Sequence, residues 1–105
     1  MVRKEKTSNG VAILHARYVK NDRKRKAALQ VERVNAEVAS LIYKLRKEAG
    51  LSQTELAKLV GTTQSVISRL EDAEYAGHSL TMLSRIASTM NQRLTVAMTP
   101  RSAED

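Results

Sequence analysis

Apolar residues in the middle of the chain recur at helical spacing in two short segments separated by a glycine. Leu56, Ala57 and Val60 share one face of the first segment, and Ile67 and Leu70 share one face of the second. Apolar stripes of this kind bury against each other when two helices pack. The pattern therefore predicts two short helices with a common core.

Capping residues set the limits of these two helices. Ser52 and Glu55 have the spacing of a capping box, which places the first helix at about residues 53–60. Gly61 suits the left-handed conformation that ends a helix, and Thr62 or Thr63 supplies a hydroxyl cap for a second helix over about residues 64–72. Residues 51–72 thus predict two helices joined by a tight corner.

The second helix carries a polar face opposite its apolar one. Gln64, Ser65, Ser68 and Arg69 share this face. A helix fits the major groove of B-DNA, where Gln suits adenine, Arg suits guanine and Ser accepts several bases. Taken singly, these residues are better explained as ordinary polar residues of a solvated helix surface. Their occurrence together with the capped corner favours DNA reading.

Two further helices are predicted before this region. One begins at Ser8 and covers residues 8–19, and a longer one is capped by Asp22 and runs to about Ala49 before Gly50. The longer helix has apolar residues at alternating spacings of three and four, typical of a coiled-coil seam. Its first half would expose apolar surface that a partner can cover. The seam consists of Val31, Val34, Val38, Leu41 and Leu45.

The C-terminal part predicts one helix and one strand. Ser79 caps a helix that ends near Asn91, and the segment 93–99 then alternates apolar and polar residues up to Pro100. A lone strand leaves its backbone groups unpaired, so we expect two copies to pair antiparallel in a two-fold dimer. Such a dimer would set two recognition helices ~34 Å apart. The alternative is a frayed tail packed on the last helix. The dimerisation residues of this strand are Leu94, Val96 and Met98.

Composition narrows the class of protein. At 105 residues the chain makes one small domain, and its core must be aliphatic because it lacks Phe and Trp. It has no Cys, and His15 and His78 are isolated, so we expect neither a metal nor a cofactor. No catalytic set of residues can be assembled, so we expect no enzyme. Without a signal peptide or a membrane span, we expect a cytoplasmic protein, located at the nucleoid when bound to DNA.

The net charge of +7 is confined to one end of the chain. Residues 1–26 hold nine basic and two acidic residues, whereas residues 27–105 hold nine of each sign. A dense basic arm can neutralise DNA phosphates without sequence selectivity. It can equally be a solvated arm that aids solubility. The sequence leaves these two readings open.

Several motifs resemble the helix-turn-helix of Xre and lambda-type phage repressors over residues 41–90. The matching motifs are Leu51-Ser52-Gln53, Leu56-Ala57, Gly61-Thr62-Thr63-Gln64, Ile67-Ser68-Arg69-Leu70-Glu71 and Ile86-Ala87. The resemblance implies that Gln53 contacts backbone phosphate and that Gln64, Ser65 and Arg69 read bases. It also implies a buried ion pair between Arg46 and Glu71. The remaining DNA-binding residues, near the backbone, are Thr62, Thr63 and Ser68.

The N-terminal extension, the C-terminal strand and the segment 70–80 resemble HigA-type antitoxins of type II toxin–antitoxin modules. This resemblance implies a protein that wraps a RelE/HigB-like messenger-RNA-cleaving toxin and represses the shared operon. RelE-like toxins are themselves basic, so residues 23–26 are expected to face DNA instead. The alternative is a stand-alone Xre-family repressor without a toxin. We place the toxin contacts on Val11, Leu14, Tyr18, Val31 and Val34.

The expected fold is mainly α. It is a lambda-repressor-like helix-turn-helix bundle with an N-terminal helical extension and a single C-terminal β-strand that pairs across a dimer. Residues 1–21 form a basic arm with a short helix, residues 22–92 form the helical domain, and residues 93–105 form the dimerisation strand and tail.

Overall fold

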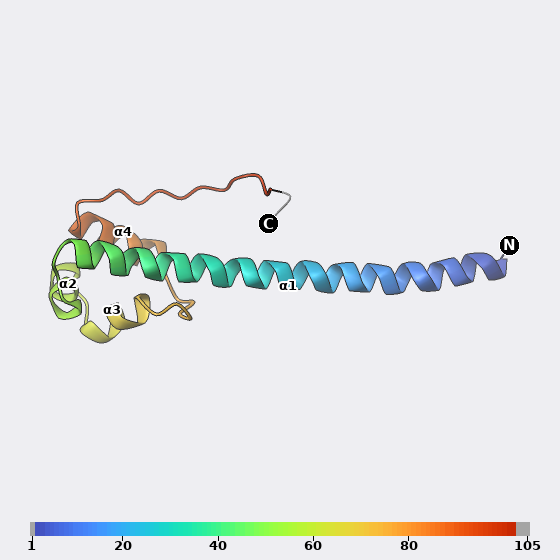
Figure 1. Ribbon diagram of the computed structural model, residues 1–105, viewed down its shortest axis with the longest axis horizontal. Helices are drawn as coiled ribbons and strands as arrows, with labels where there is room; N and C mark the ends of the chain where they lie inside the picture. The colour runs from blue at the N-terminus through green and yellow to red at the C-terminus, as the bar shows by residue number, and fades with distance from the viewer. Residues whose placement is uncertain (1, 103–105) are drawn as a thin grey trace. The chain divides into compact units, whose positions relative to one another are not determined.

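A computed structural model describes residues 2–102 of the protein, with side chains described for residues 11–102. These residues form four helices, α1 (Val2–Glu48), α2 (Gln53–Val60), α3 (Gln64–Leu70) and α4 (Leu80–Thr89) (Figure 1). The chain divides into two compact units, Met1–Val34 and Asn35–Asp105. We call them the N-terminal unit and the C-terminal unit. The expectation of a mainly helical fold is confirmed.

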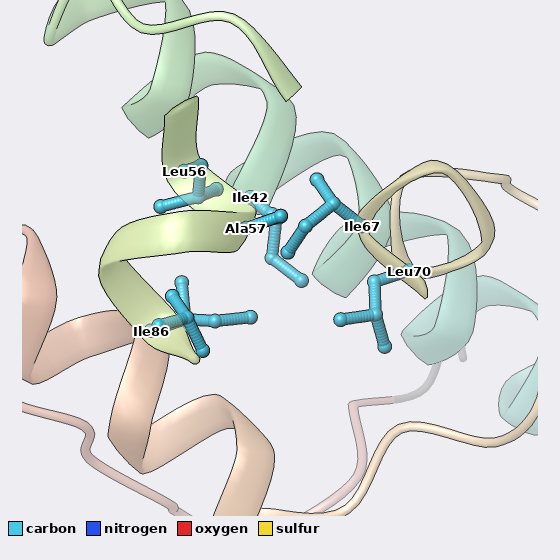
Figure 2. Packing of buried hydrophobic residues seen from close by; sticks show 7 residues of the cluster. Ile42, Leu56, Ala57, Ile67, Leu70 and Ile86 are labelled. Atoms are coloured by element: carbon cyan, nitrogen blue, oxygen red, sulfur yellow. The ribbon is translucent and has the colours of Figure 1, made fainter. Parts of the chain in front are cut away.

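The core of the C-terminal unit draws on all four helices. Figure 2 shows Leu56, Ile67 and Ile86 converging from α2, α3 and α4, together with Ile42 from α1. Leu56 and Ile67 have no exposed surface. Short helices depend on such tertiary burial, because isolated helices of this length are marginal in water. The buried apolar residues are Ala39, Ile42, Leu56, Ala57, Val60, Ile67, Leu70, Ile86 and Ala87.

The predicted caps are present on all three short helices. The Ser52 hydroxyl accepts a hydrogen bond from the Glu55 amide at 3.0 Å, and the Glu55 carboxylate accepts one from the Ser52 amide at 3.0 Å. Hydrogen bonding to the Glu55 carboxylate, first from the Ser52 backbone and then from the Ser52 side chain, lowers the pKa of Glu55. Thr63 caps α3 and Ser79 caps α4 through their hydroxyls. The predicted starts of these helices are therefore confirmed.

The first helix differs from the prediction. The sequence predicts a break near Asp22, but α1 passes through this residue without interruption. The Asp22 carboxylate lies 3.0 Å from the Arg25 guanidinium and 3.3 Å from the Lys26 ammonium. Hydrogen bonding, first from Lys26 and also from Arg25, lowers the pKa of Asp22. The carboxylate thus has partners one turn further along the helix, and Asp22 is no N-cap.

Only part of the predicted seam of α1 is buried, since Val38 packs against the core and Leu45 is half-buried. The residues of α1 that are buried in the C-terminal unit are Ala39, Ile42 and Arg46, whereas Leu41 is 55% exposed and Val38 is half-buried. Both sets have spacings of three and four. The buried set includes the charged residue Arg46. A pattern of apolar residues alone therefore selects the neighbouring set, which contains Val38, Leu41 and Leu45.

The predicted C-terminal strand is not formed in the single chain. Residues 92–102 have no regular secondary structure, and Leu94, Val96 and Met98 are 36, 63 and 96% exposed. A strand needs a neighbour to satisfy its backbone groups, and the described part of this chain offers no second strand. Pairing between two copies stays a prediction.

Candidate DNA-binding surface

The corner between α2 and α3 is fixed by its backbone and by a side chain from α4. Gly61 has φ of 83°, a left-handed conformation that other residues rarely adopt. Its amide donates to the Ala57 carbonyl at 2.9 Å, and the Thr62 amide donates to the same oxygen at 2.8 Å. The Arg85 guanidinium donates to the Val60 carbonyl at 2.7 Å. The Ala57 and Val60 carbonyls at the end of α2 therefore have partners, and these bonds fix the corner from which α3 begins.

The polar face of α3 is open to solvent. Gln64, Ser65, Ser68 and Arg69 are all exposed, whereas Ile67 and Leu70 on the opposite face are buried. The predicted division of α3 into a packed face and a free polar face is therefore present. Of the two threonines before α3, Thr63 is exposed and Thr62 is half-buried.

A buried ion pair connects the first helix to the end of α3. The Arg46 guanidinium donates to the two carboxylate oxygens of Glu71 at 2.6 and 2.9 Å and to the Leu51 carbonyl at 2.9 Å. Only 9% of the Arg46 side chain and 4% of the Glu71 side chain are exposed. The hydrogen bonding of the Arg46 guanidinium to the Glu71 carboxylate raises the pKa of Arg46 above its usual value. This two-point contact fixes both side chains in one geometry.

A chain of hydrogen bonds runs from this ion pair to the polar face of α3. The Gln53 side-chain amide donates to Glu71 Oε1 at 3.2 Å, and its Oε1 accepts from Gln64 Nε2 at 2.7 Å. The orientations of both glutamine amides follow from this chain. Gln64 keeps one N–H and its Oε1 free for a further partner, which is the donor and acceptor pair that adenine requires.

Comparison with known proteins places this geometry in a family. The sequence model of the helix-turn-helix family matches residues 42–96, which is just over half of the chain. The chain belongs to this family. The matched region is an Xre/lambda-repressor-like helix-turn-helix domain, the fold of a DNA-binding transcription regulator. No curated protein matches the chain.

An open hollow lies beside the first turns of the helix-turn-helix. It has a volume of about 710 Å³, and its lining includes Lys47 from α1, Gln53 from α2 and Gln64 from α3. The side chains of Lys47 and Gln53 offer N–H groups of the kind that contact phosphate oxygens. The position of Gln53 is therefore compatible with its expected phosphate contact, although one of its donors already serves Glu71.

The loop after α3 is fixed by Tyr75 and His78. The two rings meet edge to face, with centroids 5.2 Å apart, and His78 Nε2 lies 2.7 Å from the Leu70 carbonyl oxygen. A carbonyl only accepts, so Nε2 carries the hydrogen and His78 caps the end of α3. Arg85 caps the end of α2 in the same way, by donating to the Val60 carbonyl. This role of Arg85 is not predicted from the sequence, because no sequence motif indicates it.

The helix-turn-helix domain has little net charge of its own. The described residues 35–102 include eight basic and six acidic side chains. Arg69 and Lys58 are exposed, but Asp72 and Glu74 follow α3 directly and are also exposed. Attraction to phosphates from this unit alone is therefore weak for a DNA-binding protein.

The residues that the sequence assigns to a toxin lie outside this surface. They are exposed residues of α1 in the N-terminal unit, with 62% of Val11, 66% of Leu14 and 69% of Tyr18 accessible. Val31 and Val34 are 58 and 45% exposed. No helix among the described residues combines the length and the apolar character of a membrane span. The described side chains also include no group of three or more His, Asp or Glu arranged for a metal ion.

Proposed function

We propose that this protein represses transcription by placing the polar face of α3 in the major groove of an operator. The observation that carries the proposal is the exposure of Gln64, Ser65, Ser68 and Arg69 on a helix whose other face is buried. Gln64 would read adenine and Arg69 would read guanine, each contact contributing roughly 1–3 kcal/mol of discrimination. Gln53, Thr62 and Thr63 would position the helix on the backbone.

Footprinting tests this proposal on the DNA upstream of the gene. We expect the full-length protein to protect one short site, and a variant carrying both Gln64→Ala and Arg69→Ala to protect none at the same concentration. Uniform, weak protection of the whole fragment by the wild-type protein would refute operator reading.

We further propose that the protein is an antitoxin that neutralises a RelE/HigB-like ribonuclease and represses the operon that encodes both. Support comes from α1, where Val11, Leu14 and Tyr18 recur at spacings of three and four on one face and are more than 60% exposed. An amphipathic helix of this kind binds by laying its apolar face into a groove of a partner. Val31 and Val34 are also exposed, but they lie roughly 130° and 165° around the helix axis from this face, so they would be contacted separately.

Co-expression tests the antitoxin proposal. The product of the neighbouring reading frame should arrest growth when expressed alone, and the wild-type protein should restore it. A variant with Leu14→Gln and Tyr18→Gln should fail to restore growth while still binding the operator, because both changes lie outside residues 35–102 and leave the charge of α1 unchanged. A neighbouring product that is harmless would instead favour the alternative, a stand-alone Xre-family repressor.

We also propose that the protein acts as a homodimer through residues 93–99. Leu94, Val96 and Met98 alternate with polar residues and are exposed in the single chain. Antiparallel pairing of two such segments would satisfy their backbone groups and cover these side chains. Light scattering should give twice the monomer mass for the full chain and the monomer mass for residues 1–92. A truncated protein that still has twice the monomer mass would exclude pairing through this segment.

A further inference from the structure

Three basic residues of α1 form a stripe that has no counter-charge. Arg17, Lys20 and Lys24 recur at spacings of three and four, so they lie on one face of the helix. All three are exposed, and none takes part in an ion pair among the described side chains of residues 11–102. Arg25 and Lys26 differ, because both pair with Asp22. We call the first three residues the basic stripe.

The basic stripe lies on a different side of α1 from the apolar face. At 100° per residue, Arg17, Lys20 and Lys24 are centred roughly 120° around the helix axis from Val11, Leu14 and Tyr18. A partner that covers the apolar face therefore leaves the basic stripe accessible. The two surfaces can serve different ligands.

The distribution of charge indicates which ligand the basic stripe takes. Residues 11–34 carry seven basic and two acidic side chains, whereas residues 35–105 carry eight of each sign. Binding to DNA gains most of its sequence-independent free energy from cations that displace counterions from phosphates. The C-terminal unit has no excess of such cations, whereas residues 11–34 of α1 carry more basic than acidic side chains.

We propose that the basic stripe binds the phosphate backbone of double-stranded DNA without reading its sequence. The proposal rests on the operator binding proposed above, to which it adds a second contact. Arg17 and Lys24 are about 10 Å apart along the helix axis, a length over which a duplex carries about six phosphate charges. Two contacts from one chain reinforce each other, because the second becomes intramolecular once the first has formed.

A pair of charge-matched variants of the full-length protein tests the proposal. The first carries R17Q, K20Q and K24Q, and the control carries R25Q, K26Q and R33Q, which removes three positive charges from the other side of α1. Glutamine has nearly the helix propensity of Lys and Arg, so α1 is retained in both, as far-UV circular dichroism will verify. Fluorescence anisotropy measures the affinity of each protein for its upstream DNA and for a shuffled duplex over a range of salt concentrations.

The expected result is specific to the basic stripe. The first variant should lower the slope of log affinity against log salt by about 2 to 3, and it should bind both duplexes at least tenfold more weakly at about 0.1 M salt. Its preference for the upstream DNA should be unchanged. The control should lower the slope by less than about 1, since two of its three cations are already paired with Asp22.

Other results overturn the proposal. Equal slopes for the two variants would mean that only net charge matters, and an unchanged slope for the first variant would mean that the stripe is solvated. A first variant that keeps its DNA affinity but no longer holds an acidic protein would assign the stripe to that protein instead. Failure of the operator proposal looks different, because the wild-type protein would then bind both duplexes equally well.

Discussion

The two units of this protein use the same residue types in opposite ways. Leu56 in the C-terminal unit has no exposed surface, whereas Leu14 in the N-terminal unit is 66% exposed. Arg46 is buried against a carboxylate, whereas Arg17 is exposed and outside all the ion pairs of the described side chains. Leu56 and Arg46 thus find their partners within the C-terminal unit, whereas Leu14 and Arg17 of the N-terminal unit face solvent. This contrast supports our proposals that the C-terminal unit reads DNA with a preformed surface and that the N-terminal unit binds partners.

The largest expected effect comes from the buried ion pair. Glu71→Gln should lower the free energy of unfolding by about 3–5 kcal/mol, because it leaves the Arg46 charge buried without a counter-charge. Urea denaturation followed by circular dichroism measures the loss. The double change Arg46→Met with Glu71→Leu should cost clearly less, because it removes both charges. A double variant that is less stable than Glu71→Gln would contradict the account of this pair.

A matched pair of leucine substitutions compares the two units directly. Leu56→Ala should lower the free energy of unfolding by about 2–5 kcal/mol, since it leaves a cavity in the core. Leu14→Ala should change it by no more than about 0.5 kcal/mol, because Leu14 is exposed in the single chain. Equal losses, measured by urea denaturation, would show that the two helical regions form one core.

Arg69→Ala should affect the recognition of DNA but not the stability of the fold. We expect this change to cost roughly 1–3 kcal/mol of binding and to relax specificity at one base pair, with the free energy of unfolding unchanged. The measurement compares affinities for operators substituted at each position. If all operators weakened by the same factor, Arg69 would be a phosphate contact.

The smallest effect is the pH dependence of the α2 cap. The pKa of Glu55 is lower in the folded protein than in the unfolded chain, so its contribution to stability is fully present above the unfolded pKa of about 4.3. It is lost as the pH falls through the folded pKa. Glu55→Gln should reduce the slope of stability against pH in this acid range. An unchanged slope would show that the capping box is not maintained in solution.

The sequence predicts the limits of α2 and α3 well, because the residues that set these limits act locally. Ser52, Gly61 and Thr63 act within a few residues, and all three have their predicted roles. The hydrogen bond between Gln53 and Gln64 and the bond from Arg85 to Val60 have no local signal, since each joins residues that only the fold brings together. The spacing of apolar residues in α1 does not distinguish Leu41, which is 55% exposed, from its buried neighbour Ile42. Alternation of apolar and polar residues alone predicts the C-terminal strand, and this pattern does not supply a neighbouring strand.

The central claim is that the exposed polar side of α3 selects a DNA sequence. The most direct measurement is the ratio of affinities of the wild-type protein for its upstream DNA and for a shuffled duplex of equal length at about 0.15 M salt. The account predicts a preference of roughly 1,000-fold or more. Equal affinity for the two duplexes would contradict it.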